Sequence, residues 1–330
     1  MFRFDEEKEK KLVDGIIADV KKIEKAVDTC WEKGVENVFL LGIGGTIASA
    51  QEIEAYFRGH LSLPVMAVNA ADLTDLGDTR LKEHSLAVIT SVTGNTPELL
   101  KAIRYFQKKG GRVIGFVEDE GTEMAETVDY EISVKGSSYI KLLLAMTRLA
   151  WNAGEFDEYD RFVKQLACLG DNYVRIQKEA DEKARRFAEK HWNDDLLYVT
   201  GSGSLWGAAY TLAMCYMEEM LWMKTKSISC ADFFHGTLEV IEKDSNLLVL
   251  MGEDGTRSQA ERVVRFANQI CDHVEVFDTA DYALKGIEEK YRILLIPVIM
   301  TAVYGRIVSN LENVRKHPTE IRRYYHRLSY

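Results

Sequence analysis

Three hydroxyl side chains lie between an apolar run and a helical pattern within residues 88–103. Ser91, Thr93 and Thr96 surround Gly94, and Pro97 follows as a favourable first helical residue with Thr96 as its N-cap. A helix N-terminus presents free N–H groups and the positive end of the helix dipole, so this turn carries groups that bind a phosphate. It contains no lysine and is not a nucleotide-binding P-loop. An ordinary strand–turn–helix explains the turn equally well.

A glycine-rich loop forms the second candidate binding element. Gly42, Gly44, Gly45 and Thr46 follow the apolar strand pattern of residues 38–41 and precede a helical pattern. The full G-x-G-x-x-G spacing is absent, so the loop matches a dinucleotide-binding fingerprint only loosely. Its glycines nevertheless allow the backbone to approach a ligand closely.

Glu219 is a candidate general base. It lies in a predicted helix, from about residue 204 to residue 223, that is apolar almost all round and therefore buried. Its spacing, three residues after Tyr216 and seven after Leu212, places it on the inner face. A carboxyl there either pairs with a cation or has its pKa raised from ~4.3 towards roughly 6–7, the useful range for a base. From this pattern alone, a structural ion pair and a catalytic role are equally plausible.

His235 is the second candidate for proton transfer. It lies sixteen residues after Glu219, between Phe234 and Gly236, and follows a stretch (227–232) that we expect to be irregular. An ordinary imidazole pKa near ~6.5 suits proton transfer. A lone loop histidine is more often simply solvated, so this residue needs further support.

Strand and helix patterns alternate along the chain, which predicts an α/β fold with parallel sheets. We expect strands at 38–41, 65–68, 86–89, 113–117, 197–201, 247–251, 274–277 and 293–297. We expect helices at 5–33, as one amphipathic helix, at 47–57 and 138–154, and as a charged pair within 155–194.

The strand and turn motifs occur twice. Gly44 corresponds to Gly203 at an offset of 159 residues, and Thr96 corresponds to Thr256 at an offset of 160. A repeated pattern at a nearly constant offset is stronger evidence than either motif alone, and it predicts two doubly wound, flavodoxin-like halves. The expected organisation is an N-terminal helix (1–34), a first α/β domain (35–154), a helical connector (155–194), and a second α/β domain with a C-terminal tail (195–330).

The second copy of the hydroxyl-rich turn is acidic. Glu253 and Asp254 replace its hydroxyls, and carboxylates repel a phosphate. We therefore expect one functional phosphate turn per chain.

Composition excludes several classes of protein. The 330 residues are 46% hydrophobic and 28% charged with a net charge of −10, which argues against a nucleic-acid partner. We expect no apolar stretch long enough to cross a membrane and no signal peptide. The five cysteines are widely spaced, which suggests reduced thiols and a cytoplasmic location.

The double α/β layout and the hydroxyl-rich turn resemble the SIS (sugar isomerase) domain proteins over nearly the whole chain. The segment from Gly201 through Glu219 to His235-Gly236 is similar to the isomerase half of glucosamine-6-phosphate synthase. The fructoselysine- and fructosamine-6-phosphate deglycases resemble the chain most. Their likeness extends to Glu253-Asp254-x-x-Arg257 and to His317-Pro318-x-Glu320-x-Arg322-Arg323-Tyr324.

This resemblance implies a site and a reaction. The phosphate of a sugar phosphate would be held by Gly44, Gly45, Thr46, Ser91, Thr93 and Thr96. His235 would assist ring opening, and Glu219 would move a proton from C1 to C2 of a phosphorylated ketoamine. The resulting imine would be hydrolysed to glucose 6-phosphate and a free amine, without a metal or redox cofactor. In the synthase the loop histidine reaches the neighbouring subunit's site, so we expect a homodimer with shared sites and with Phe233 and Phe234 available for an interface.

Departures from the synthase favour a deglycase. Thr93 replaces the usual second serine of the turn and keeps a hydroxyl, and the closing segment HRLSY has no lysine. We also expect no glutaminase domain. Two alternatives stay open: another SIS-type isomerase or amino-sugar phosphate deaminase, and a non-enzymatic sugar-phosphate sensor or binding subunit.

Overall fold

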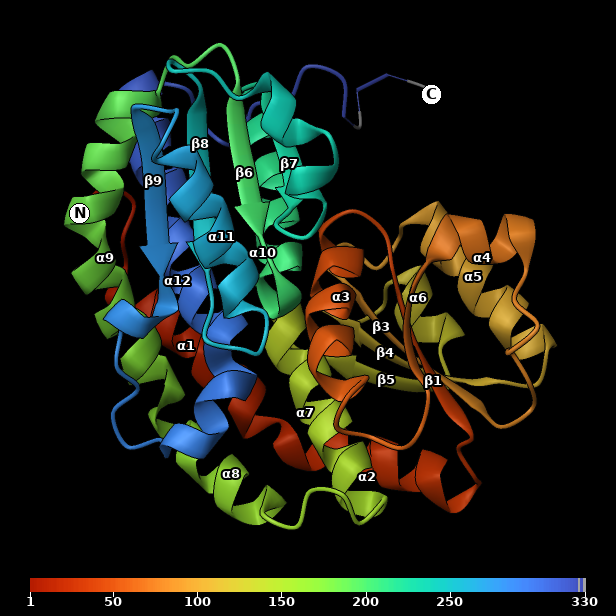
Figure 1. Cartoon of the computed structure of the whole chain (residues 1–330). Helices are drawn as coiled ribbons and strands as arrows, with labels where there is room; N and C mark the ends of the chain where they lie inside the picture. Colours follow the sequence, from red (N-terminus) through yellow and green to blue (C-terminus); the bar gives the residue numbers. More distant parts are fainter. Residues whose placement is uncertain (326, 329–330) are drawn as a thin grey trace. The chain divides into compact units, whose positions relative to one another are not determined.

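The computed structural model describes residues 1–325, 327 and 328. Its contacts divide the chain into two compact units. Figure 1 shows the whole chain, coloured from the N-terminus (red) to the C-terminus (blue). The first unit contains Glu7–Asp171 and Leu284–Leu294. The second unit contains Met1–Glu6, Asn172–Ala283 and Leu295–Tyr330. Each unit is a parallel sheet with helices, so the expected α/β fold with two doubly wound halves is confirmed.

The sheet of the first unit has five parallel strands in the order β2-β1-β3-β4-β5. The strands are β1 (Asn37–Gly42), β2 (Val65–Asn69), β3 (Ser85–Ser91), β4 (Arg112–Val117) and β5 (Tyr130–Ser133). β1 and β3 are buried along their whole length because helices cover both faces, and this explains their continuous apolar runs. Side chains alternate between the faces, so Phe39 and Leu41 join Ile89 and Phe106 in one core.

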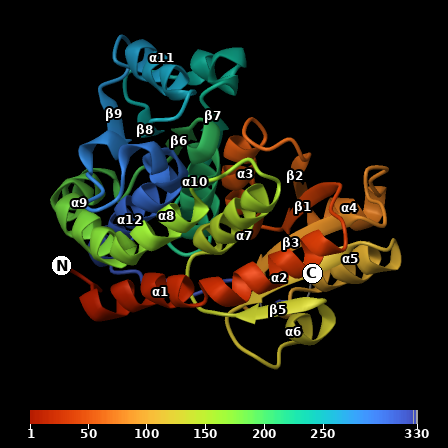
Figure 2. The same ribbon diagram turned by 90° about the horizontal axis from the view of Figure 1, so that it is seen from below.

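Helices cover both faces of this sheet (Figure 2). Six of them are α2 (Val20–Glu32), α3 (Gly45–Phe57), α4 (Ala70–Leu76), α5 (Pro97–Lys108), α6 (Glu123–Thr127) and α7 (Ser138–Asn152), and α8 (Tyr159–Gln165) contacts α7. α7 packs against α2, α3 and β3, whereas α5 packs against α4, α6 and β4. The N-terminal helix expected at 5–33 is interrupted at Asp19, so α1 (Glu6–Ala18) precedes α2 as a separate helix.

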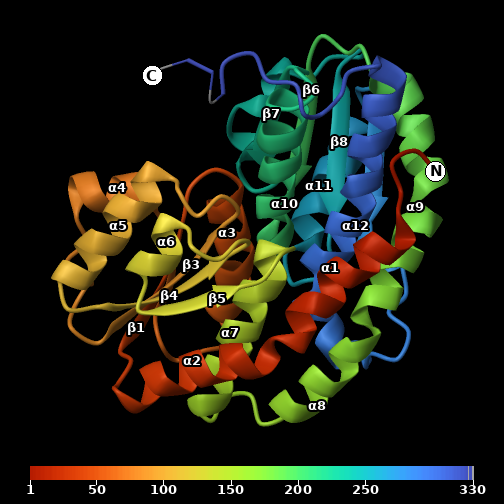
Figure 3. The ribbon, with the colours of Figure 1, turned by 180° about the vertical axis from the view of Figure 1, so that it is seen from behind.

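The sheet of the second unit has four parallel strands in the order β7-β6-β8-β9. The strands are β6 (Leu197–Gly201), β7 (Thr225–Ser229), β8 (Asn246–Met251) and β9 (His273–Asp278). α11 (Arg257–Ala267) covers one face in Figure 1, and Figure 3 shows α10 (Trp206–Tyr210) and α12 (Glu289–Arg315) from the other side. α9 (Leu169–His191) flanks β9, where the rings of Phe187 and Phe277 meet edge to face.

Other expectations about secondary structure are also wrong. Residues 293–297 form part of α12 instead of a strand, since a short apolar run does not distinguish a buried helix from a strand. β5 and β7 are strands that the apolar pattern did not predict, and β7 includes Ser227–Ser229 of the stretch expected to be irregular. Both strands are only partly buried, so their sequences mix polar and apolar residues.

α12 also has the length and composition of a membrane span, contrary to expectation. An 18-residue window of this helix has a mean hydropathy of 1.6, and 78% of that window is buried inside the protein. Burial of this extent is typical of a core helix.

Candidate functional site

The two candidate binding loops follow neighbouring strands of the first sheet. β1 and β3 are adjacent and parallel, with Leu41 in register with Ile89, so the loops at 43–46 and 92–96 leave the same edge. The order β2-β1-β3 makes the β1/β3 pair the point where strand order reverses, and doubly wound sheets bind ligands there. The structure therefore places all six predicted phosphate residues at one edge of the sheet, where the strand order reverses.

A hydrogen bond within the β3–α5 turn stabilises its shape. Ser91 is buried, and its Oγ accepts a hydrogen bond from the Gly94 N–H at 3.0 Å. Gly94 has φ +65°, and a Cβ there would lie 2.3 Å from Oγ1 of Thr122. Ser91 and Gly94 therefore shape the turn, while Thr93 is exposed.

Thr96 occupies the predicted N-cap position of α5, but its hydroxyl makes no capping hydrogen bond. The expectation of a threonine cap is wrong in this respect. The backbone is nevertheless extended at Thr96, with φ −70° and ψ 116°, as N-cap residues require. Its hydroxyl and the first amides of α5 are left to a ligand.

The β1–α3 loop is shaped by glycine and closed by threonine. A Cβ at Gly42 would lie 2.4 Å from the backbone nitrogen of Ile47, and Gly44 has φ +58°. Thr46 Oγ1 accepts from the Ile43 N–H at 3.0 Å and donates to the Ile43 carbonyl at 2.9 Å. The Thr46 hydroxyl is thus committed to its own turn.

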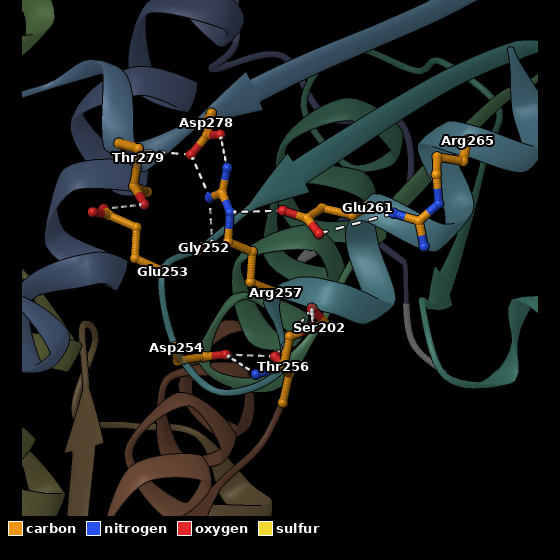
Figure 4. A network of polar contacts seen from close by, with 11 residues as sticks. Ser202, Gly252, Glu253, Asp254, Thr256, Arg257, Glu261, Arg265, Asp278 and Thr279 are labelled. Atoms are coloured by element: carbon orange, nitrogen blue, oxygen red, sulfur yellow. Dashed lines mark hydrogen bonds and ion pairs between the residues drawn. The ribbon is translucent and has the colours of Figure 1, made fainter.

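The corresponding turn of the second unit is filled by its own carboxylate (Figure 4). Oδ2 of Asp254 accepts hydrogen bonds from the backbone N–H and the hydroxyl of Ser204, at 3.0 and 2.7 Å. Oδ1 accepts from the backbone N–H and the hydroxyl of Thr256, at 2.8 and 2.5 Å. Burial raises the pKa of Asp254, but these hydrogen bonds outweigh burial and hold that pKa below its usual value. The Asp254 carboxylate therefore occupies the hydrogen-bond donors that this turn could otherwise offer to a phosphate.

Arg257 ties the same turn to the end of β9. Its guanidinium donates to both carboxylate oxygens of Asp278, at 3.0 and 2.6 Å, and to the carbonyl of Gly252 at 2.9 Å (Figure 4). Glu261 accepts from Arg257 Nε at 3.1 Å. Arg257 is thus held by protein groups, which gives the Glu253–Arg257 segment a structural role.

Glu219 follows a π-helix that spans Thr211–Glu218. The Glu219 N–H donates to the carbonyl of Met214 at 3.1 Å, five residues back. The Glu219 side chain is 30% exposed, whereas α-helical spacing predicted that it lies on a buried inner face. π-helical turns occur frequently at functional sites.

Arg322 of the C-terminal segment pairs with Glu219. Nε of Arg322 donates to Oε1 of Glu219 at 3.0 Å, and both side chains are partly buried. Of the two states considered for a carboxyl here, the structure shows the paired one. Trp222, just beyond Glu219, lies against the His317 ring, with centroids 4.3 Å apart, and under the guanidinium of Arg323 at 4.0 Å.

Cys215, close to Glu219, is a poor candidate for a nucleophile because its thiol stays protonated. Burial, with Glu219 and Glu218 nearby, raises the pKa of its thiol to about 12. All five cysteines are free, as expected.

His235 is an exposed residue at the end of a 3₁₀ turn, η4 (Asp232–His235). Phe233 is fully buried, and Phe234 packs edge to face on Phe233 and on Phe266 of α11. Both aromatic rings anchor the His235 loop to its own unit. The expectation that they are available for a subunit interface is therefore wrong for Phe233 and weakened for the half-buried Phe234.

Glu219 and His235 lie at opposite ends of β7. The Thr225 hydroxyl, at the start of β7, donates to Glu218 at 2.6 Å, whereas the Cys230 N–H beyond its end donates to the Gly201 carbonyl at 3.0 Å. Five strand residues span roughly 16 Å at ~3.3 Å per residue. Among the described residues, no hydrogen bond or ion pair joins Glu219 to His235 within one copy of the chain.

Sequence reasoning missed two charged residues. Arg322 had appeared only as part of a C-terminal resemblance, and Lys141 of α7 carried no motif. Lys141 is 2% exposed, and burial lowers its pKa to about 8, with Glu118 opposing the shift. A lysine flanked by apolar residues at 139–146 was the available signal.

Among the described residues, no group of three or more His, Cys, Asp or Glu side chains could hold a metal ion. The expected absence of a metal or redox cofactor stays a prediction. The segment HRLSY lies partly outside the described residues, at His326, Ser329 and Tyr330.

Comparison with known proteins identifies the first unit's fold. Residues 33–150 match the family model of the SIS domain. The chain is 25% identical over 310 residues to fructosamine deglycase FrlB of Bacillus subtilis, covering 90% of this chain and 94% of that protein. It is 24% identical over 316 residues to fructoselysine 6-phosphate deglycase of Escherichia coli K12, covering 93% and 90%.

Solved structures show the same fold over both units. A Bacillus subtilis protein classed with the phosphosugar isomerases has a TM-score of 0.89 at 23% identity, covering 96% of this chain and 99% of that one. The C-terminal domain of glucosamine-fructose-6-phosphate aminotransferase from Francisella tularensis has a TM-score of 0.78 at 12% identity, covering 94% and 95%.

Proposed function

We propose that this SIS-domain protein, an enzyme of the deglycase and phosphosugar isomerase type, is a fructosamine-6-phosphate deglycase. Its substrate is a 6-phosphorylated ketoamine with an amino acid nitrogen on C1, such as fructoselysine 6-phosphate. Its products are glucose 6-phosphate and the free amine. The observation that carries the proposal is a hydroxyl-rich turn at the β1/β3 switch point of a chain that aligns over nine-tenths of its length with two named deglycases.

The phosphate binds at the switch point of the first unit. Thr93 and Thr96 donate their hydroxyls, and the first amides of α3 and α5 complete the cradle. Ser91 fixes the shape of the turn by accepting a hydrogen bond from the Gly94 N–H. The backbone of Gly44 and Gly45 approaches the ligand closely. Binding energy at the phosphate positions C1 and C2 for proton transfer.

Glu219 acts as the base and His235 assists ring opening. The Glu219 carboxylate takes the proton from C1 of the open-chain ketoamine, and the electrons form a C1–C2 enaminol. A proton returned at C2 leaves an imine between C1 and the nitrogen. Water adds to that imine and the C1–N bond breaks, which releases the amine and the C1 aldehyde. The ion pair with Arg322 fixes the orientation of the Glu219 carboxylate.

The site is shared between two copies of the chain. Glu218, beside Glu219, contacts the start of β7, whereas the turn that carries His235 follows its end, and this supports a site in which separate copies supply the two groups. In a two-fold homodimer, His235 of each copy would lie beside Glu219 of the other copy, so each site would contain both groups.

Another SIS-type activity is the second candidate, because an aldose–ketose isomerase or an amino-sugar phosphate deaminase uses the same proton transfer. A panel assay separates these activities. The deglycase hydrolyses the 6-phosphorylated ketoamines of lysine, asparagine or glycine, and leaves glucosamine 6-phosphate and fructose 6-phosphate unchanged. Turnover of glucosamine 6-phosphate or fructose 6-phosphate alone overturns the deglycase assignment. Binding without any turnover indicates a sugar-phosphate sensor.

We also place the enzyme in the cytoplasm. Five free cysteines are typical of a reducing compartment. A phosphorylated substrate is also typical of cell interiors. Fractionation of cells that express the chain tests this location.

A further inference from the structure

Lys141 is a buried cation that forms no ion pair with any carboxylate among the described residues. It lies in the first turn of α7, three residues after the N-terminus at Ser138, and its side chain is 2% exposed. In the described part of the chain no carboxylate forms an ion pair with it. Burying an unpaired ammonium group is costly, and the positive end of a helix dipole adds to that cost. Charged groups kept at such a cost are candidates for function.

The chain around Lys141 converges on the edge that carries the phosphate turn. Val117 at the end of β4 is in register with Ser91 at the end of β3. The Val134 N–H donates to the Val117 carbonyl at 2.9 Å, and α7 begins four residues later. Glu118, directly after Val117, accepts a hydrogen bond from the Gly136 N–H at 3.4 Å. The start of α7 is therefore bonded to strands at the same edge as Ser91.

The phosphate turn itself lacks positive charge. No lysine or arginine occurs in residues 43–46 or 91–96. Lys135, in the neighbouring loop, is exposed and forms an ion pair with Asp119 at 2.8 Å. Lys141, on the helix that begins beside this edge, is thus a cation without an ion pair among the described residues.

Among the charged groups on the elements around Lys141, Glu118 is the one that acts on its pKa. On α2, Glu24 pairs with Lys21 and Asp28 pairs with Arg148. On α3, burial raises the pKa of Glu52 well above its usual value and so favours its neutral form. β3 carries no charged residue, and the charged residues of α8 are Asp160, Arg161 and Lys164. Glu118 is the group that acts on the pKa of Lys141.

We infer that Lys141 supplies the positive charge that binds the substrate's phosphate dianion at the β1/β3 switch point. This inference rests on the proposed function and adds a binding residue to its phosphate site. A protonated lysine at this edge complements hydroxyls and amides, which are neutral donors. The cost of burying the cation in the free protein is offset when the dianion binds.

Calorimetry with inorganic phosphate tests the inference on the wild-type protein, Lys141→Met and the control Lys135→Met. We expect Lys141→Met to weaken binding at least tenfold and Lys135→Met to leave it unchanged. At pH 8.5 wild-type Lys141 is partly deprotonated, because its pKa is about 8. Phosphate binding should therefore take up a fraction of a proton in the wild type, measured in buffers of different ionisation enthalpy, and none in Lys141→Met.

The outcomes separate this inference from the proposed function. Thermal unfolding first establishes that Lys141→Met is folded, and we expect it to be at least as stable as wild type because it removes a buried charge. If Lys141→Met binds phosphate as tightly as wild type while Thr96→Val does not, the role of Lys141 is overturned and the phosphate turn stands. If wild type and Lys135→Met both fail to bind phosphate, the phosphate site and the inference fall together.

Discussion

Arg322 Nε donates a hydrogen bond to Glu219 Oε1 across 3.0 Å, joining residues 103 positions apart. The C-terminal segment thereby lies on the candidate base, and His317 and Arg323 hold the adjacent Trp222 from the same segment. The carboxylate that the proposed reaction needs is thus oriented by a segment distant in sequence.

Arg322→Ala should lower kcat about tenfold while KM changes little, because it frees the Glu219 carboxylate to adopt unproductive orientations. The pair is partly exposed, so the free energy of unfolding should change by about 1 kcal/mol or less. Steady-state kinetics and denaturant unfolding measure both effects. Arg185→Ala, which breaks ion pairs of the same unit with Glu182 and Glu189, is the matched control and should keep wild-type kcat. Equal kcat values for the two variants would contradict the orienting role.

Thr96→Val and Thr46→Val should separate binding from structure. Thr96 makes no capping hydrogen bond, so its replacement should raise KM and lower kcat with little change in melting temperature. The Thr46 hydroxyl bridges both backbone groups of Ile43, so its replacement should cost about 1 kcal/mol of stability. Kinetics beside thermal unfolding checks both variants. Unchanged KM and kcat in Thr96→Val would exclude its hydroxyl from phosphate binding.

Asp254→Asn should destabilise the second unit by roughly 1–3 kcal/mol, since an amide leaves part of its four donor contacts unmet. The folded-state pKa of Asp254 is lowered, so its contribution is present above its unfolded pKa of about 3.8 and is lost as pH falls through the lower folded value. The stability difference between wild type and variant should therefore shrink below about pH 4. A constant difference across that range would show that the charge of Asp254 is not what stabilises the turn.

Mixing two inactive variants tests the shared site. Glu219→Gln and His235→Ala, unfolded together and refolded in equal amounts, should form about half mixed dimers. If the two groups act across chains, one site of each mixed dimer is intact, and about a quarter of all sites regain activity. Mixed dimers confirmed by mass spectrometry but without recovered activity would place both groups in one chain. A monomer in sedimentation would exclude the dimer.

Local patterns predicted the switch point of the first unit. The apolar strands 38–41 and 86–89, the glycines between 42 and 45, and Pro97 at the start of α5 each act within a few residues, so the sequence alone indicated them. The internal repeat extended the prediction to β6 and β8, including the change from hydroxyls to Asp254.

The same reasoning failed where tertiary structure overrides local pattern. A π-helix does not follow the 3.6-residue spacing that placed Glu219 on an inner face. The apolar run 293–297 lies within the 27-residue buried helix α12. Arg322 and Glu219 are 103 positions apart, so no local motif could indicate that they pair. Only the folded chain shows that Lys141 is buried without a carboxylate partner in the described part of the structure.

The most direct test of the central claim is the reaction of the wild-type chain with fructoselysine 6-phosphate in deuterated water. We expect glucose 6-phosphate and lysine in equal amounts, with deuterium at C2 of at least part of the sugar, because the proton returned at C2 has exchanged with solvent. Glu219→Gln should slow product formation by at least ~10² while substrate binding stays intact. If the 6-phosphorylated ketoamines of lysine, asparagine and glycine all stay uncleaved, or if Glu219→Gln cleaves at the wild-type rate, the account is wrong.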